Sequence, residues 1–394
     1  MELLDLFLVA LVPVLKVLLV TGIGTFLAID GIDLLGTHAR HHLNNLVFYV
    51  FSPALVVSQL GETITYHNLV KLWFMPVNIL LTFVIGSALA WILIKIAKTP
   101  PHLQGIVIGC CSAGNLGNLL LIIVPAVCEE SNSPFGDATL CATYGKAYAS
   151  LSMAVGAIYI WTYVYIIMRI YADKSSDRTN DGDNNYTQAL LEDAPPDITS
   201  LAKPVEKATF IQRTFQRVKD FAAKTNLKMV FAPSTIAAIF GFIIGTVTPI
   251  RKVMIGDSAP LHVIDSSASM LGDATIPAMT LIVGANLLRG LKGSGSGVGV
   301  RVIVGVVIVR YVLMPLMGIG VVKAAKHFGL VGSDSLYLFI LLLQYALPPA
   351  MSIGVIAQLF EAGESECSVI MLWTYAVATF SLTLWSTFYM WLLG

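Results

Sequence analysis

The sequence has little charge and none of the common signatures of a soluble enzyme. Only 12% of its 394 residues are charged, against about 25% in a soluble globular domain, and the formal net charge is zero. It has no phosphate-binding loop, no HExxH motif and no CxxC pair among its five cysteines. We therefore expect no enzyme activity, no cofactor, no metal site, no disulfide framework and no nucleic-acid partner.

Long apolar stretches dominate the sequence. The hydrophobic fraction is 56% and the mean hydropathy is +0.78. Runs of roughly 20 apolar residues, the length that crosses a bilayer as a helix, recur along the whole chain. The first run carries Glu2 and Asp5 in place of a basic leader, so we expect a retained first helix. The composition predicts a multi-pass protein whose main partner is the lipid bilayer.

Ten apolar spans are expected, five on each side of one polar segment. They cover about residues 5–28, 43–60, 70–95, 103–127, 139–171, 228–248, 266–288, 300–323, 335–360 and 367–393. We divide the chain into a first five-helix repeat at 1–171, a hydrophilic loop at 172–225 and a second five-helix repeat at 226–394. The loop is too polar to bury a core.

Irregular positions recur in the same order in the two halves. Pro53 in span 2 corresponds to Pro277 in span 7, and Pro76 in span 3 corresponds to Pro315 in span 8. Spans 4 and 9 are both interrupted near their middle. Because five is an odd number of spans, the second half must enter the membrane from the opposite side. The predicted fold is all-α: ten transmembrane helices in two inverted repeats, with helices 4 and 9 broken and crossing.

The two interrupted spans are the candidate binding site. Span 4 contains Gly114, Asn115, Gly117 and Asn118, and span 9 contains Pro348 and Pro349. Glycine permits unwound backbone and proline interrupts a helix, and a membrane protein tolerates such breaks only where they are buried or line a cavity. Crossing half-helices present positive N-terminal ends at mid-membrane, which suit a carboxylate. The alternative is a simple proline kink with packing glycines.

Single polar residues within the spans are further candidates. They are Lys16, Lys146, Asp273, Arg310 and Gln344. Intramembrane charges are costly and usually face a cavity, so Lys16 and Gln344 are placed as substrate contacts, with Tyr345 and Tyr144 flanking an aromatic ring. Alternatively, Asp273 and Arg310 form a structural ion pair and Lys146 extends to the interface. His38 to His42 is interpreted as a solvated turn, without metal ligation.

Lysine and arginine residues near the span ends set the expected orientation. They concentrate in and around the central loop, which places this loop in the cytosol and both termini outside or in a lumen. A glycan on the sequon at Asn185 would overturn this assignment.

Three stretches carry a family resemblance: residues 44–54, 114–118 and 343–349. With the short central loop, they resemble the plant PIN-LIKES proteins of the auxin efflux carrier family. This resemblance implies the inverted five-plus-five fold, an endoplasmic reticulum membrane location with lumenal termini, and intracellular accumulation of auxin, the carboxylate indole-3-acetic acid. In PIN carriers the substrate lies at the crossing of helices 4 and 9, which maps onto Asn115, Asn118, Pro348 and Pro349.

One departure from the PIN pattern concerns the supporting charges. PIN carriers have a lysine in span 2 and an aspartate at the start of span 3, where this sequence has Tyr49 and Asn68. The predicted function is auxin transport by elevator- or rocking-type alternating access, by a protein that would act alone or as a homodimer. The alternatives are a sodium-coupled organic-anion carrier and a non-transporting receptor for a small carboxylate.

Overall fold

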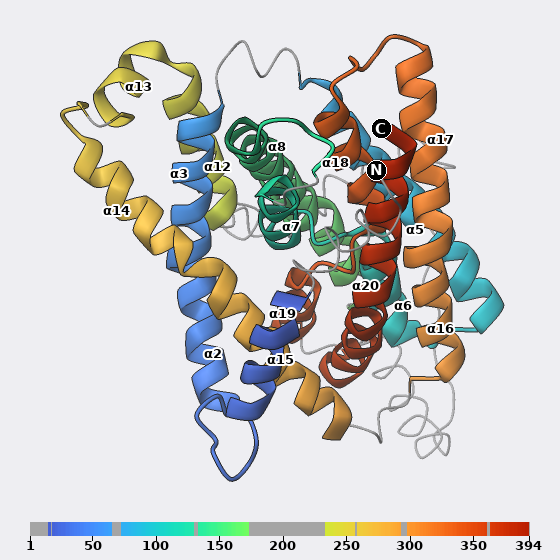
Figure 1. Ribbon diagram of the computed structural model, residues 1–394. Coiled ribbons are helices and arrows are strands. Elements are labelled where there is room, and N and C mark those ends of the chain that lie inside the picture. Colours follow the sequence, from blue (N-terminus) through green and yellow to red (C-terminus); the bar gives the residue numbers. More distant parts are fainter. Residues whose placement is uncertain are drawn as a thin grey trace, which may run out of the picture.

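The structure is a computed structural model that describes residues 15–16, 18–64, 72–129, 133–172, 233–256, 258–292, 298–360 and 363–393. Every regular element in these ranges is a helix (Figure 1). Among the described residues, six helices are long and apolar enough to cross a membrane: Thr37–Glu62, Phe74–Ala97, Ala138–Ala172, His262–Asn286, Val300–His327 and Ser365–Leu393. The expected all-helical integral membrane class is therefore confirmed. Asn68 and residues 173–225 of the predicted loop, including Asn185, lie outside the described residues.

Several of the long spans are assembled from shorter segments. In chain order these are α2 (Thr37–Leu46), η1 (Val47–Phe51), α3 (Ser52–Thr63), α5 (Phe74–Ala97), α6 (Pro101–Ser112), α7 (Asn118–Glu129), α8 (Ala138–Tyr159), η2 (Ile160–Val164), α12 (Pro233–Thr246), α13 (Thr248–Met254), α14 (His262–Asp273), α15 (Thr275–Lys292), α16 (Val300–Ile308), η3 (Val309–Leu313), α17 (Met314–His327), α18 (Ser335–Ala346), α19 (Ser352–Leu359) and α20 (Glu364–Leu393). The three η segments are π-helical turns, which occur often at functional sites.

Local sequence explains where several helices begin and end. Lys98 adopts a left-handed conformation that ends α5, and Pro101 opens α6 at a position where no N–H is needed. Asp137 caps α8 by accepting hydrogen bonds from the backbone N–H groups of Thr139 and Leu140. Asp334 caps α18 in the same way. These caps place polar residues at the ends of apolar spans.

The helices pack in two groups. On one side α3 contacts α12 and α14, and α12 continues into α13 after a bend of 99° (Figure 1). On the other side α5 packs on α6 and α16, and α18 packs on α17 and α20. Contacts of α3 with α8 and of α15 with α20 join the two groups. The interrupted helices α6–α7 and α18–α19 belong to the second group.

The residues around His38 to His42 correct one expectation. They form the first part of α2, within the span Thr37–Glu62, in place of the expected turn, and the side chains of His38, His41 and His42 are exposed. Arg40 donates hydrogen bonds from Nη1 to the carbonyl oxygen of Ala285 (3.1 Å) and to Oδ1 of Asn286 (3.0 Å) in α15. Packing against a neighbouring helix therefore extends the span beyond its apolar residues.

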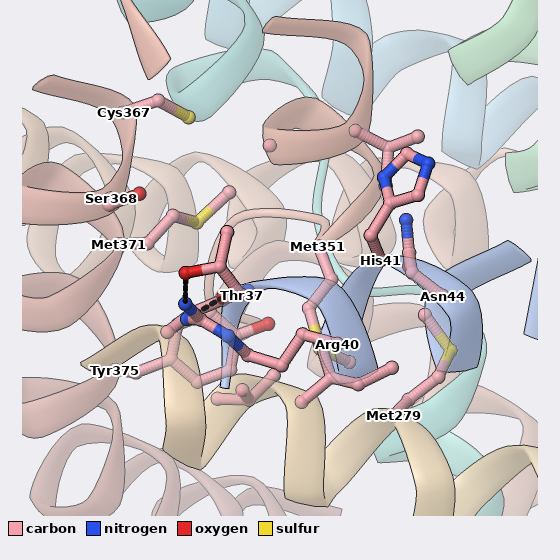
Figure 2. Close-up of a pocket in the computed structure, with 15 residues that line it drawn as sticks. Thr37, Arg40, His41, Asn44, Met279, Met351, Cys367, Ser368, Met371 and Tyr375 are labelled. Atoms are coloured by element: carbon pink, nitrogen blue, oxygen red, sulfur yellow. Dashed lines mark hydrogen bonds between the residues drawn. The ribbon is translucent and has the colours of Figure 1, made fainter. Parts of the chain in front are cut away.

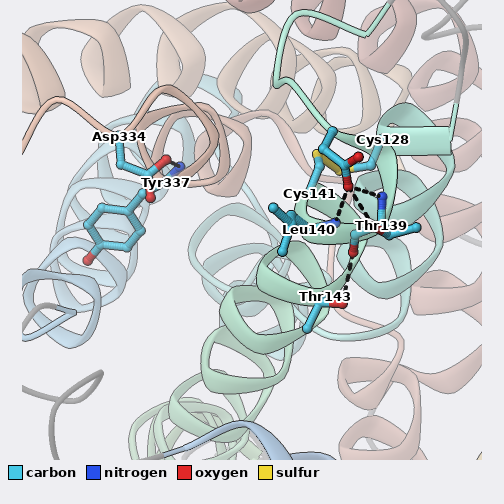
Figure 3. The surroundings of a disulfide bond; sticks show 8 residues. Cys128, Thr139, Leu140, Cys141, Thr143, Asp334 and Tyr337 are labelled. Atoms are coloured by element: carbon cyan, nitrogen blue, oxygen red, sulfur yellow. Dashed lines mark hydrogen bonds between the residues drawn. A yellow bond between two sulfur atoms is a disulfide. The ribbon is translucent and has the colours of Figure 1, made fainter.

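The cysteines correct a second expectation. Cys128 at the end of α7 and Cys141 in the first turns of α8 form a disulfide, with Cα atoms 5.5 Å apart (Figure 3). Sequence spacing alone does not reveal a bridge between the end of one span and the start of the next. Cys110 and Cys111 are buried and unbridged, as expected for small packing residues.

Candidate functional site

Two interrupted helices form the centre of the site. The helix of span 4 stops at Ser112 and resumes at Asn118, and the helix of span 9 stops at Ala346 and resumes at Ser352. The predicted positions of both breaks are therefore confirmed. Each break brings a C-terminal and an N-terminal helix end into the buried interior of the protein, where backbone polar groups need partners.

The two breaks satisfy each other's backbone groups. The N–H of Asn115 donates to the carbonyl oxygen of Pro348 at 2.8 Å, and the N–H of Ala350 donates to that of Ala113 at 2.9 Å. Gly114 and Pro349 form an antiparallel bridge at the point where the chains cross. The predicted crossing of the two broken spans is thus present in the fold, and we call residues 113–117 and 347–351 the crossover.

Tyr375 of α20 holds the crossover from the side. Its hydroxyl donates to the carbonyl oxygen of Pro349 at 2.9 Å and accepts from Nδ2 of Asn115 at 3.0 Å. The Asn115 side chain is only 5% exposed, so this hydroxyl fixes the orientation of an otherwise buried amide. The NH2 group of the amide is therefore the end that faces Tyr375.

Arg310 lies behind the crossover, in the π-helical turn η3. Its side chain is completely buried and donates to the carbonyl oxygens of Cys111 (3.1 Å), Pro348 (3.2 Å) and Leu347. Asp273 is exposed. The guanidinium therefore bonds to the crossover backbone, and the alternative of an Asp273–Arg310 ion pair is wrong.

A cavity of about 100 Å³ borders the crossover. Its walls include Gly114, Asn115 and Gly117 from the first break and Met351 and Ser352 from the second. The opposite walls come from α3, α8, η2, α12 and α15, which contribute Ser52, Val56, Met153, Trp161, Ser234 and Met279. The cavity thus combines polar backbone on one side with apolar and aromatic side chains on the other, as small-molecule sites commonly do.

Helix ends give this crossover cavity a positive potential. Ser352 is the first residue of α19, and Gly117 directly precedes the first residue of α7. Both residues line the cavity. The dipole of a helix N-terminus attracts anions, and two such ends meet here.

A second cavity, of about 120 Å³, lies next to the first and shares Met279 and Met351 with it. Figure 2 shows Arg40 and His41 of α2 facing this second cavity, with residues of α20 across from them. None of the described residues that line it is acidic. We call it the Arg40 cavity; it lies between α2, α15, α19 and α20, beside the crossover cavity.

The predicted site residues divide into two sets. Gly114, Asn115 and Gly117 line the crossover cavity, and Pro348 and Pro349 lie in the second break. Asn118 begins α7, and its side chain lies outside the described residues. The substrate-binding role of all these residues stays a prediction.

Four other predicted residues lie elsewhere. Lys16 is exposed, and Tyr144 is 49% exposed and stacks on Tyr148. Gln344 and Tyr345 are almost fully buried in α18. None of the four lines the crossover cavity, the Arg40 cavity or the third, apolar cavity beside Pro348.

Gln344 and Tyr345 take part in a hydrogen-bond network between helices. Oε1 of Gln344 accepts from Nδ2 of Asn78 at 2.7 Å, and its Nε2 donates to Oγ of Ser152 at 3.1 Å. The Tyr345 hydroxyl donates to Oδ1 of Asn78 at 3.3 Å. In this conformation the network joins α5, α8 and α18, which gives both residues a structural role.

Sequence reasoning missed four residues that lie at or beside the site. Tyr375 lies in an apolar span without a proline or charge to mark it, and Met279 and Met351 are ordinary apolar residues in the sequence. Only their convergence on the crossover identifies them. The sequence predicts a turn around Arg40. An arginine so close to an apolar span is itself a reason to consider a functional role.

Comparison with known proteins assigns the family. A family model described as "Membrane transport protein" matches residues 9–386. Among curated relatives from Arabidopsis thaliana, Protein PIN-LIKES 1 is 54% identical over all of this chain and 81% of its own length. Protein PIN-LIKES 3 and Protein PIN-LIKES 4 are 51% and 46% identical, each over the full length of both chains. The predicted resemblance is confirmed: the chain belongs to the membrane transport protein family and, within it, to the PIN-LIKES proteins.

Proposed function

We propose that the protein transports auxin, as the indole-3-acetate anion, across the endoplasmic reticulum membrane and so accumulates auxin inside the cell. The observation that carries the proposal is the crossover cavity, where the N-terminal ends of α7 and α19 and the Asn115 amide meet an apolar wall. Membership of a membrane transport family supports transport over a purely sensory role.

The cavity chemistry matches an aromatic carboxylate. The carboxylate would accept hydrogen bonds from backbone N–H groups at the two helix ends and from Asn115, and Asn118 begins the helix on the same side. The indole ring would lie against Trp161, Met279 and Met351. Aromatic and thioether groups favour such contact with a flat apolar ring.

The helix arrangement supports ten spans in two inverted repeats. Besides the six long helices, the bent pair α12–α13, the two interrupted pairs α6–α7 and α18–α19, and the short apolar helix Leu18–Leu27 each supply one candidate span. Span 4 and span 9 then occupy the same place in their repeats. In transporters with inverted repeats, alternating access comes from movement of one bundle against the other around a central site.

The disulfide supports the proposed orientation. Cys128 and Cys141 flank the connection between spans 4 and 5, which in a ten-span arrangement lies on the side opposite to the central loop. Disulfides persist in an oxidising compartment such as the endoplasmic reticulum lumen. A lumenal connection at 130–137 therefore fits lumenal termini and a cytosolic loop at 172–225.

Flux of radiolabelled indole-3-acetate into proteoliposomes tests the proposal. We expect saturable uptake by the wild type and at least a tenfold loss in Asn115→Ala, because a hydrogen bond to a charged group contributes about 1.5–3 kcal/mol. Asn78→Ser is the matched control, since Asn78 is also a buried asparagine but lines none of the three cavities.

Three outcomes separate the proposal from its rivals. Uptake that requires sodium would point to a sodium-coupled organic-anion carrier, and saturable binding without flux would point to a receptor. Equal flux in Asn115→Ala, Pro348→Ala and the wild type would show that the crossover is not the substrate site.

A further inference from the structure

Arg310 is the largest side chain that is completely buried in the described part of the chain, and it occupies an unusual position. Its three acceptors are the carbonyl oxygens of Cys111, Leu347 and Pro348. Cys111 is in the last turn of α6, and Leu347 directly follows α18. The guanidinium therefore sits between the C-terminal ends of the two half-helices, while their partners α7 and α19 begin on the other side of the crossover.

The helix ends provide a simple estimate of charge. Each end carries roughly half an elementary charge, negative at the C-terminus and positive at the N-terminus. The C-termini of α6 and α18 thus contribute about one negative charge, which the Arg310 guanidinium cancels. About one positive charge remains at the N-termini of α7 and α19, which matches a monovalent anion.

We propose that Arg310 is a built-in counter-charge that sets the preference of the crossover for a monoanion. In transporters with broken helices, exposed carbonyls and half-helix C-terminal ends commonly coordinate a transported sodium ion or proton. Here the guanidinium makes bonds of the same kind to three carbonyl oxygens. The inference rests on the proposed function, because it concerns the same cavity, and it assigns Arg310 a positioning and electrostatic role without substrate contact.

Gly114 connects this arginine to the substrate side. A Cβ atom at Gly114 would lie 2.7 Å from Nη2 of Arg310, too close for a real contact. Gly114 also lines the crossover cavity. Only Gly114, which has no side chain, therefore separates the guanidinium from the cavity. At this short distance the charge can act on a ligand in the cavity. A side chain at this position would force the guanidinium to move.

The test compares an acid with its uncharged amide. Equilibrium binding of indole-3-acetate and indole-3-acetamide is measured on the purified full-length protein, wild type and Arg310→Gln, Arg310→Lys and Arg251→Gln. Arg251 is the matched control because it also donates to carbonyls at a helix end, those of Gly61 and Glu62 in the last turn of α3 and of Ile64 just after it. It lines none of the three cavities. Damage to the fold would weaken both ligands, whereas loss of the charge would weaken the acid alone.

We expect the acid-to-amide affinity ratio to fall by about tenfold or more in Arg310→Gln, since removing a unit charge within about 12 Å at an effective dielectric constant of 20 has that effect. The ratio should be retained in Arg310→Lys and Arg251→Gln. An unchanged ratio in Arg310→Gln would overturn the role of Arg310 and leave the proposed function intact. A wild type that binds neither ligand would overturn both.

Two further measurements cover the case in which Arg310→Gln does not fold. Gly114→Ala places a methyl group against Nη2 but keeps the guanidinium charge at nearly the same distance from the cavity, so it should leave the acid-to-amide ratio unchanged. Replacement of sodium by choline should leave indole-3-acetate binding by the wild type unchanged, because the position between the C-terminal ends is filled. A ratio that falls tenfold in Gly114→Ala, where the charge is retained, or binding that requires sodium, would contradict the inference.

Discussion

Replacing Asn115 with aspartate places a second carboxylate beside the one that the proposed substrate carries. Asn115 is 5% exposed, lines the crossover cavity and is held in place by the bond from its backbone N–H to Pro348. Two unit charges about 4 Å apart repel by about 4 kcal/mol at an effective dielectric constant of 20, which corresponds to roughly a thousandfold loss of affinity. Partial protonation of the new carboxylate would relieve some of this repulsion. We therefore expect indole-3-acetate binding to weaken by at least about a hundredfold at neutral pH.

Equilibrium binding of radiolabelled indole-3-acetate to the purified protein measures this loss. The uncharged indole-3-acetamide should lose much less affinity, and the penalty for the acid should shrink as the pH falls and the new carboxylate takes up a proton. Asn78→Ser serves as the control, because it removes the buried bonds to Leu341 and Gln344 without altering a cavity wall. Affinity of Asn115→Asp for the acid within about threefold of the wild type would refute the reasoning.

The remaining predictions concern stability and access. Gln344→Leu should lower the free energy of unfolding by about 2–4 kcal/mol, seen by thermal unfolding in detergent, because it removes two buried hydrogen bonds; an unchanged stability with a raised KM would instead indicate substrate contact. Replacing Cys128 and Cys141 together with alanine should cost about 3 kcal/mol, and a reductant should destabilise the wild type and leave the double variant unaffected. Arg40→Gln should raise the KM for indole-3-acetate severalfold at low salt, and the difference should shrink at high salt as screening increases; equal KM values at low salt would remove Arg40 from the access route. Hydrogen bonds from the Thr139 hydroxyl and the Leu140 backbone hold the pKa of Asp137 below its ordinary value, so its stabilising contribution is present above the unfolded pKa and is lost as the pH falls through the folded pKa. Asp137→Asn should make the free energy of unfolding depend less on pH in the acid range. An unchanged pH dependence would contradict the lowered pKa of Asp137.

The membrane class and the positions of the two breaks could be predicted because they follow from local chemistry. A bilayer demands long apolar helices, and this demand is visible in composition. Gly114 and Gly117 in one span, with Pro348 and Pro349 in another, interrupt helices through backbone freedom and missing N–H groups, whichever residues pack around them. The structure accordingly breaks both helices where the sequence predicts it.

The role of each intramembrane polar residue could not be predicted in the same way. Gln344 and Arg310 are both polar residues in apolar spans, and the sequence gives no means of telling a network member from a counter-charge. The difference lies in their neighbours: Asn78 and Ser152 for Gln344, and crossover carbonyls for Arg310. Those neighbours are far apart in sequence and meet only through helix packing.

The sequence by itself determined that this chain is an integral membrane protein and that it resembles a family of transporters. It also determined that two of the spans are broken at glycine–asparagine and proline–proline positions. Tertiary structure alone decided that the two breaks bond to each other, that Tyr375 orients Asn115, and that Cys128 reaches Cys141. The physical reason is that helix breaks are set by backbone chemistry within a few residues, whereas a binding site is set by which helix ends and side chains packing brings to one point.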